Sequence, residues 1–194
     1  DRNEANGYKN LLLKINKPPT PHIDFNENDL SAKKFIAFRA ASSKDLDGKI
    51  ISYAWDFGDN SPIDYNETAL HSYETGGNET VKLTLKDNDG AVSSISQDIH
   101  INWPPTAKFS VDPQDPSKGE PVSFNASSSS DPDGRILEYS WDFGENKVEP
   151  DVYTSEFAMH TYYRPQKYNV TLTVEDGKGS TGSFSQLVEV KEII

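Results

Sequence analysis

Eight oxygen-bearing side chains recur in two matched sets, and their types suit the binding of a divalent cation. Each set is an Asn, two Asp of one turn and an Asp of a later turn: Asn16, Asp45, Asp47 and Asp87, then Asn102, Asp131, Asp133 and Asp176. Calcium takes six to eight oxygen ligands, and extracellular modules bind it with a Kd of roughly 10⁻⁴ to 10⁻³ M. If the segments of each set converge, the chemistry they support is Ca²⁺ binding.

The acidic turns also have a purely structural interpretation. In Asp45-Leu46-Asp47-Gly48 and Asp131-Pro132-Asp133-Gly134 the first Asp can bond its own backbone while Gly takes positive φ. Lys44 and Ser130 precede the shared Asp, where a further acid would help a metal site. The turn interpretation and the metal interpretation both stay open.

The chain is an internal duplication. Pro18-Pro19-Thr20 aligns with Pro104-Pro105-Thr106, and Tyr53-Ala54-Trp55-Asp56-Phe57-Gly58 aligns with Tyr139-Ser140-Trp141-Asp142-Phe143-Gly144. After a three-residue insertion in the second copy, His71-Ser72-Tyr73 matches His160-Thr161-Tyr162. Matching at a fixed offset predicts two copies of one structural unit.

Alternating apolar residues predict that each copy is a β-sandwich. Ile51, Tyr53, Trp55 and Phe57 are expected on one buried face, with Leu137, Tyr139, Trp141 and Phe143 as their counterparts. About seven short strands separated by Gly, Asp and Pro turns indicate two antiparallel sheets of immunoglobulin type. The two Trp are then core residues rather than platforms for stacking sugars.

The predicted boundaries follow the repeat. Residues 1–17 are expected to be the last strand of a preceding copy and its linker, residues 18–103 the first domain, and residues 104–194 the second. In this topology the two acidic turns and the entry linker of a copy lie at one end of its sandwich. Trp103, in the linker, is expected either to pack between the domains or to face a ligand.

The motifs carry a family resemblance. Trp55-Asp56-Phe57-Gly58-Asp59, with the Asp45 turn before it and His71-Ser72-Tyr73 after it, resembles the polycystic kidney disease (PKD) domain, and the second copy resembles it at the matching positions. Glu145 departs from the Asp that the family favours. The resemblance implies tandem immunoglobulin-like (PKD-type) antiparallel β-sandwiches.

The resemblance also carries expectations about function. PKD domains are extracellular modules of microbial surface proteins, accessory domains of secreted proteases and chitinases, and parts of polycystin, so binding or spacing is implied rather than catalysis. In the PKD-like modules of bacterial collagenases, a linker Asn and acids of the Asp-rich turn are similar to calcium ligands. The resemblance thus implies calcium as a candidate cofactor of the two sets.

Charge and composition exclude several function classes. With 19 Lys+Arg against 31 Asp+Glu the net charge is −12, which argues against nucleic acid and anionic membranes. No run approaches the ~18 apolar residues of a membrane span, and the absence of Cys excludes thiolate sites. The recurring His-x-Tyr suits a structural hydrogen bond, and no nucleophile elbow is evident. The chain is therefore not expected to be an enzyme.

Four Asn-x-Ser/Thr sequons predict glycosylation: Asn66, Asn78, Asn125 and Asn169. Tandem copies, acidity and sequons favour a structural or adhesion module of a microbial cell-surface protein, such as a surface layer, with protein, glycan or self-association as partners. The alternative is an accessory substrate-binding module of a secreted protease or chitinase. Both interpretations place the chain outside the cell.

Overall fold

A computed structural model describes residues 15–145, 151–153 and 155–192. Across these residues the chain forms antiparallel β-strands, with a 3₁₀ helix η1 (Glu27–Asp29) that Asn26 caps by accepting a hydrogen bond from the backbone N–H of Asn28. No helix in this part of the chain is long and apolar enough to cross a bilayer. The predicted strand of a preceding copy falls mostly on residues 1–14, outside the described residues.

The first copy contains two sheets. One pairs β1 with β3, and the other has the order β2-β4-β5. Their bounds are Ile36–Arg39 for β1, Ile50–Asp56 for β2, Thr68–His71 for β3, Gly77–Asp87 for β4 and Val92–Ile101 for β5.

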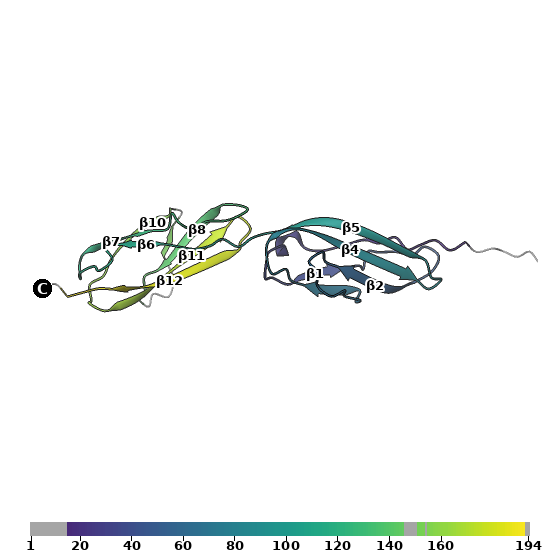
Figure 1. Ribbon diagram of the computed structural model, residues 1–194, viewed down its shortest axis with the longest axis horizontal. Coiled ribbons are helices and arrows are strands. Elements are labelled where there is room, and N and C mark those ends of the chain that lie inside the picture. The colour runs from purple at the N-terminus through teal and green to yellow at the C-terminus, as the bar shows by residue number, and fades with distance from the viewer. Residues whose placement is uncertain (1–14, 146–150, 154, 193–194) are drawn as a thin grey trace, which may run out of the picture. The chain divides into compact units, whose positions relative to one another are not determined.

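The second copy repeats this arrangement with additional strands (Figure 1). One sheet has the order β10-β7-β6 and the other the order β12-β11-β8-β9. The bounds are Ser110–Asp112 for β6, Pro121–Asn125 for β7, Ile136–Asp142 for β8, Asp151–Tyr153 for β9, Phe157–Thr161 for β10, Lys167–Asp176 for β11 and Thr181–Glu189 for β12.

A matched tryptophan lies at the centre of each core. Trp55 and Trp141 are both 0% exposed, which confirms the prediction that they are core residues. Trp55 stacks on Phe57 with ring centroids 6.4 Å apart, and Trp141 stacks on Phe143 at 6.1 Å. Phe124 of the opposite sheet reaches Trp141 at 5.6 Å, so aromatic contacts join the two sheets without a disulfide.

The strict alternation predicted for the Trp strands is wrong at their first residues. Ile51 is 61% exposed and Leu137 is 46% exposed, although both were expected on the buried face. The pairing register shifts between Ile50 and Ser52, and again between Glu175 and Asp176 opposite β8. A β-bulge puts one extra residue into a strand, which reverses the direction of the side chains beyond it.

The recurring His-x-Tyr is part of the core. Tyr162 is 0% exposed, and its hydroxyl donates to the Phe143 carbonyl at 3.1 Å. The His160 ring lies parallel to Phe143 at 4.3 Å and edge-on to Tyr162 at 4.6 Å. His71 and Tyr73 also meet edge-on, at 4.6 Å. The motif therefore holds the turn after the Trp strand against the core.

Backbone contacts group the chain into two compact units. One contains the segment that ends at Phe25 together with Ala37–Leu70 and Thr80–Gln97, and the other contains Asn26–Ile36, His71–Glu79 and the segment that begins at Asp98. The domain boundaries taken from the repeat stay a prediction. Each candidate site described below lies within one of these units.

Candidate functional site

The first oxygen-rich end is organised by Asp87. This residue is 0% exposed, and Asn16 Nδ2 donates to its Oδ2 at 2.8 Å. The other oxygen accepts hydrogen bonds from the backbone N–H groups of Asp89 at 2.9 Å and Ala91 at 2.8 Å. Burial alone would raise the pKa of Asp87, but these hydrogen bonds stabilise the charged form and lower the pKa below its ordinary value.

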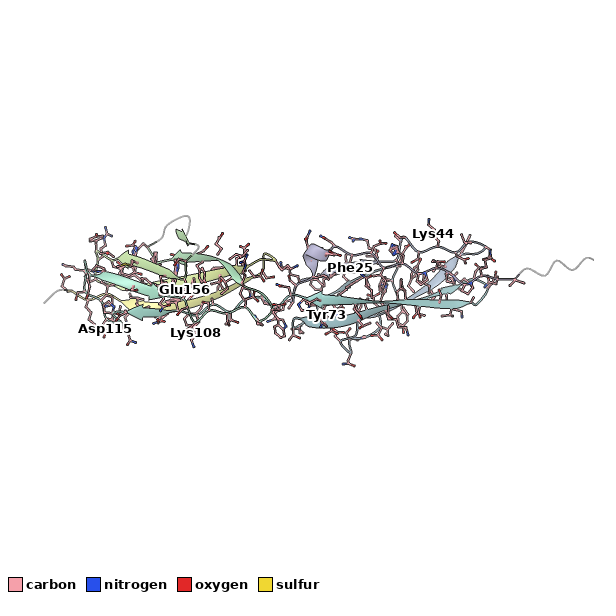
Figure 2. All side chains as sticks on the ribbon, turned by 90° about the horizontal axis from the view of Figure 1, so that it is seen from above. Phe25, Lys44, Tyr73, Lys108, Asp115 and Glu156 are labelled. Atoms are coloured by element: carbon pink, nitrogen blue, oxygen red, sulfur yellow. The ribbon has the colours of Figure 1, made fainter. Side chains whose placement is uncertain are left out.

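The Asp45 turn completes this end. Asp45 Oδ1 accepts hydrogen bonds from the backbone N–H of Asp47 at 3.2 Å and of Gly48 at 3.0 Å. The backbone N–H of Lys17 lies 3.3 Å from Asp47 Oδ2, which brings the entry linker to the turn. Lys44, before the turn, is exposed and points away from the strands (Figure 2).

The glycine of this turn leaves space for a neighbouring carboxylate and does not take positive φ. Gly48 and Gly134 are not among the described glycines with positive φ, which corrects that part of the turn interpretation. A Cβ added at Gly48 would lie 2.6 Å from Asp45 Oδ2, and one added at Gly134 would lie 2.6 Å from Asp131 Oδ2. In each turn the Asp carboxylate occupies the space that a side chain would need.

Two oxygens at the first end have no hydrogen-bond partner among the described residues. They are Asn16 Oδ1 and Asp45 Oδ2, and both atoms are buried. A buried oxygen without a donor is costly, and a cation is one partner that satisfies a carboxylate and an amide oxygen together. These two oxygens are therefore of the kind that a calcium ion takes as ligands.

The second end repeats the geometry with different neighbours. Asn102 Nδ2 donates to Asp176 Oδ2 at 2.7 Å, and the backbone N–H groups of Lys178 and Ser180 donate to Asp176 Oδ1 at 2.7 Å and 2.8 Å. The backbone N–H of Trp103 lies 3.1 Å from Asp133 Oδ2. Here too one buried oxygen, Asp131 Oδ2, lacks a partner among the described residues.

The pKa values of the two turn carboxylates at the second end are shifted in opposite directions. Burial raises the pKa of Asp131, and the neighbouring carboxylates of Asp133 and Asp176 raise it further. Burial opposes ionisation of Asp133 as well, but the backbone N–H of Trp103 and the side chain of His100 outweigh it, so the pKa of Asp133 is lowered.

Three partners at the second end are not indicated by the repeat. Ser180 Oγ accepts from Asn102 Nδ2 at 3.1 Å and bonds Ser31 Oγ at 3.0 Å. His100 Nε2 lies 2.9 Å from Asp133 Oδ2. Ser31, Asn102 and Ser180 are all nearly buried. Ser180 aligns with Ala91, so only a mismatch between the copies could have pointed to it.

Carboxylates and histidines alone do not form a metal centre in this structure. Across the described ranges, no three His, Asp or Glu side chains are grouped closely enough to hold an ion. A cation at either end would therefore need the Asn oxygen and backbone or water oxygens as well. The metal assignment of the eight predicted residues stays a prediction.

The remaining predicted residues lie on the surface. Asn66, Asn78 and Asn169 are exposed, and Asn125 is partly buried opposite Phe157. Trp103 is 36% exposed and lies on Gly76, where an added Cβ would meet its ring at 2.4 Å. Glycosylation of the four sequons stays a prediction.

The fold and these ends define a class of protein: tandem immunoglobulin-like sandwich modules with an Asn–Asp contact at the entry of each copy. The model of the PKD domain family matches residues 16–103 and 102–191. The chain therefore belongs to the PKD domain family. The matches take up nearly all of the chain, so this chain consists of PKD domains, which are non-catalytic modules.

The proteins to which this chain is similar include bacterial proteases. The chain is 44% identical over 86 residues, 44% of its length, to collagenase ColQ1 of Bacillus cereus (strain Q1). It is 29% identical over 181 residues, 92% of its length, to the pre-pro-metalloprotease PrtV of Vibrio cholerae (strain M66-2). The chain spans 9% and 19% of the lengths of these two proteins.

Solved structures include PKD domains of the same kind. The PKD1 domain of Vibrio anguillarum Epp is 28% identical to this chain with a TM-score of 0.41, and the match covers 46% of this chain and 100% of that domain.

Proposed function

We propose that this chain is an accessory module of an extracellular protease that contacts a fibrous protein substrate such as collagen. The observation that carries the proposal is the 44% identity to a protein named as a collagenase, over a segment as long as one copy. The names of the relatives favour this accessory role over the cell-surface adhesion role. The role is binding and spacing, since the chain consists of PKD domains.

Exposed apolar residues at equivalent positions are the proposed contact surface. Leu70 of β3 is 65% exposed and Met159 of β10 is 68% exposed. Phe157, two residues before Met159 and on the same face of β10, is 52% exposed. Contiguous exposed apolar surface is typical of interaction sites, and Phe157 and Met159 provide it on one face of β10. An exposed apolar residue recurs at the position shared by Leu70 and Met159, which suits a substrate that is itself repetitive.

Calcium is the proposed cofactor of this module. Asn16 Oδ1 and Asp45 Oδ2 would hold the ion at the first end, with Asp131 Oδ2 as the corresponding atom at the second end. When bound, the ion supplies positive charge that neutralises the clustered carboxylates. The chain's own contribution is to fix the entry linker to the Asp turn through the Asn16–Asp87 and Lys17–Asp47 hydrogen bonds.

Sedimentation of the 194-residue chain with insoluble collagen fibrils, chitin and cell envelopes tests the proposal. The chain is expected to sediment with collagen, and the double variant Leu70→Ser/Met159→Ser is expected to lose most of this binding. Leu46→Ser is the matched control, because Leu46 is 79% exposed but belongs to the Asp turn. Retention on chitin or cell envelopes without retention on collagen would contradict the proposal.

A further inference from the structure

Phe157 is a large aromatic side chain that the second core does not bury. It lies on the outer face of the sheet β10-β7-β6 and is 52% exposed, whereas its neighbour Ala158 points inward and is 4% exposed. Its partner on β7 is Asn125, the asparagine of the sequon Asn125-Ala126-Ser127. An exposed aromatic ring therefore lies beside a residue that can carry a glycan.

The pairing of β7 with β10 brings these two side chains close together. The backbone N–H of Ala126 donates to the carbonyl of Glu156 at 2.8 Å, so these two residues form a hydrogen-bonded pair. In an antiparallel ladder the next pair, Asn125 with Phe157, is then non-hydrogen-bonded, with Cα atoms only about 4.5 Å apart. Side chains of such a pair share one face and approach each other most closely, so the Phe157 ring is within reach of a group attached to Asn125.

The amide of Asn125 presents its nitrogen for modification. Its Oδ1 accepts a hydrogen bond from the backbone N–H of Ser127 at 2.9 Å, which forms an Asx turn within the sequon. Nδ2 donates to no described residue and is not among the buried polar atoms that lack a partner, so it is open to solvent. In the sequon of the first copy that begins at Asn66, by contrast, Nδ2 donates to Asp64 Oδ1 at 2.8 Å.

The two copies differ at this pair as a unit. The first copy has Arg39 in place of Asn125 and Thr68 in place of Phe157. The exposed aromatic ring is therefore absent where the sequon is absent. This coincidence links the exposure of Phe157 to the asparagine opposite it rather than to the fold that both copies share.

A second sequon shows a related coincidence. Asn169 of β11 pairs with Leu187 of β12, which is 65% exposed. The first copy has Thr80 and Asp98 at these positions, so the sequon and the exposed apolar side chain are again absent together. Leu187 is aliphatic and offers no ring for a sugar, which makes this pair a matched control for the first.

We propose that Asn125 carries an N-linked glycan whose first sugar packs on the ring of Phe157. The transfer forms a bond from Asn125 Nδ2 to C1 of a sugar on a lipid-linked pyrophosphate, breaks the bond from C1 to that pyrophosphate, and releases one amide proton. The C–H groups on one face of a pyranose are attracted to the electron-rich face of an aromatic ring. The sugar then covers apolar surface that otherwise contacts water.

This inference goes beyond the proposed function and does not depend on it. Phe157 also belongs to the proposed contact surface, so a glycan on Asn125 covers one end of that surface in the second copy. The collagen test varies Leu70 and Met159 and needs no glycan. Each proposal can therefore fail without the other.

Secretion of the full 194-residue chain from a yeast that performs N-glycosylation tests the site. Gln replaces Asn66, Asn78 and Asn169, so that Asn125 is the remaining sequon of the chain. Endoglycosidase H trims the glycan to its first sugar, and intact mass measures occupancy. Asn125 is expected to be occupied, and an unmodified chain would overturn the assignment of the site.

Thermal unfolding of the trimmed glycoform and of the same chain made in a bacterium without N-glycosylation tests the contact. The first sugar is expected to raise the melting temperature by about 2–4 °C, and Phe157→Ser should abolish this gain. Leu187→Ser is the matched control, because it removes a similarly exposed apolar side chain away from Asn125 and should keep the gain. A gain of unchanged size in Phe157→Ser would overturn the contact.

The ring current of Phe157 provides a second readout of the same contact. Proton NMR of the trimmed glycoform should show the N-acetyl methyl group of the first sugar shifted upfield. Phe157→Leu keeps apolar surface without a ring and should return this signal to its ordinary position, while circular dichroism checks that the variant is folded. An unshifted methyl signal in the chain that retains Phe157 would contradict stacking of the sugar on the ring.

Discussion

The two oxygen-rich ends have the same Asn–Asp contact but differ in the side chains around it. At both ends the second oxygen of the turn Asp, Asp45 or Asp131, has no partner among the described residues. The second end differs in its neighbours, because Ser180 accepts from Asn102 Nδ2 and His100 contacts Asp133. The same Asn–Asp contact is therefore surrounded by different side chains in the two copies, and those side chains lie outside the repeated motif.

The largest expected effect on stability compares the cores of the two copies. Trp55→Ala and Trp141→Ala each remove a fully buried ring, so each should lower the free energy of unfolding by about 3–5 kcal/mol. Denaturant unfolding measures both. Trp103→Ala is the control, because its side chain is about one-third exposed, and it should cost far less. A cost for Trp103→Ala equal to those of the core variants would contradict this ranking.

The next effect compares the two asparagines in metal-free protein. Asn102→Ala removes two hydrogen bonds from a residue that is 8% exposed, and it leaves Asp176 Oδ2 and the Ser180 hydroxyl short of a donor. A loss of about 1–3 kcal/mol is expected. Asn16→Ala removes one partly buried hydrogen bond and should cost less. Thermal unfolding in a chelator measures both, and a larger loss for Asn16→Ala would contradict the ranking by burial of these hydrogen bonds.

A third effect uses alkaline pH to probe the second core. Burial raises the pKa of Tyr162 well above its ordinary value, with further contributions from Glu145, Tyr168 and Asp142. The neutral phenol is favoured in the folded state, so the stability it contributes is present below a pH of about 10 and falls as pH rises beyond it. Tyr162→Phe loses the bond to the Phe143 carbonyl and should cost about 1 kcal/mol near neutrality.

The pH dependence of the stability difference between wild type and Tyr162→Phe tests the raised pKa of Tyr162 more directly than the size of that difference. Wild-type protein must keep Tyr162 neutral above pH 10 to stay folded, whereas the variant has no such requirement, so the stability difference should shrink between pH 8 and pH 11. Denaturant unfolding at several pH values checks it. A constant difference across this range would show that Tyr162 titrates normally.

The smallest effect on stability concerns the two turn glycines. Gly48→Ala and Gly134→Ala each place a Cβ 2.6 Å from an Asp oxygen, so that carboxylate must move. Neither glycine has positive φ, so no backbone strain is added and the melting temperature should change by only a few degrees. Calcium affinity should fall in both variants, because the displaced carboxylate is a proposed ligand in each copy. An unchanged affinity in both would contradict the proposed ligands.

The sequence predicts the architecture well because its signals are periodic and repeated. Alternation and the repeated Trp-Asp-Phe-Gly indicate buried strands, and the structure places Trp55 and Trp141 at the centre of the cores. The bulges that expose Ile51 and Leu137 could not be predicted, because an extra residue in a strand leaves no mark in an apolar pattern. Positive φ at Gly48 was expected from turn statistics, whereas the structure shows instead that the side-chain oxygens of Asp45 and Asn88 lie where a Cβ would be.

The candidate ends are predictable only in part. The order of the eight oxygen-bearing residues indicates that they converge, and the Asn16–Asp87 and Asn102–Asp176 distances of 2.8 Å and 2.7 Å show that contact. The roles of Ser31, His100 and Ser180 depend on three-dimensional proximity across distant segments. No local spacing encodes such contacts.

Amide chemical shifts recorded during a Ca²⁺ titration test the central claim most directly. The account predicts that Ca²⁺ shifts the amides of the Asp45–Gly48 and Asp87–Ala91 turns, and those of the matched Asp131–Gly134 and Asp176–Ser180 turns, at millimolar concentrations. Unchanged shifts in all four turns up to about 10 mM would contradict it.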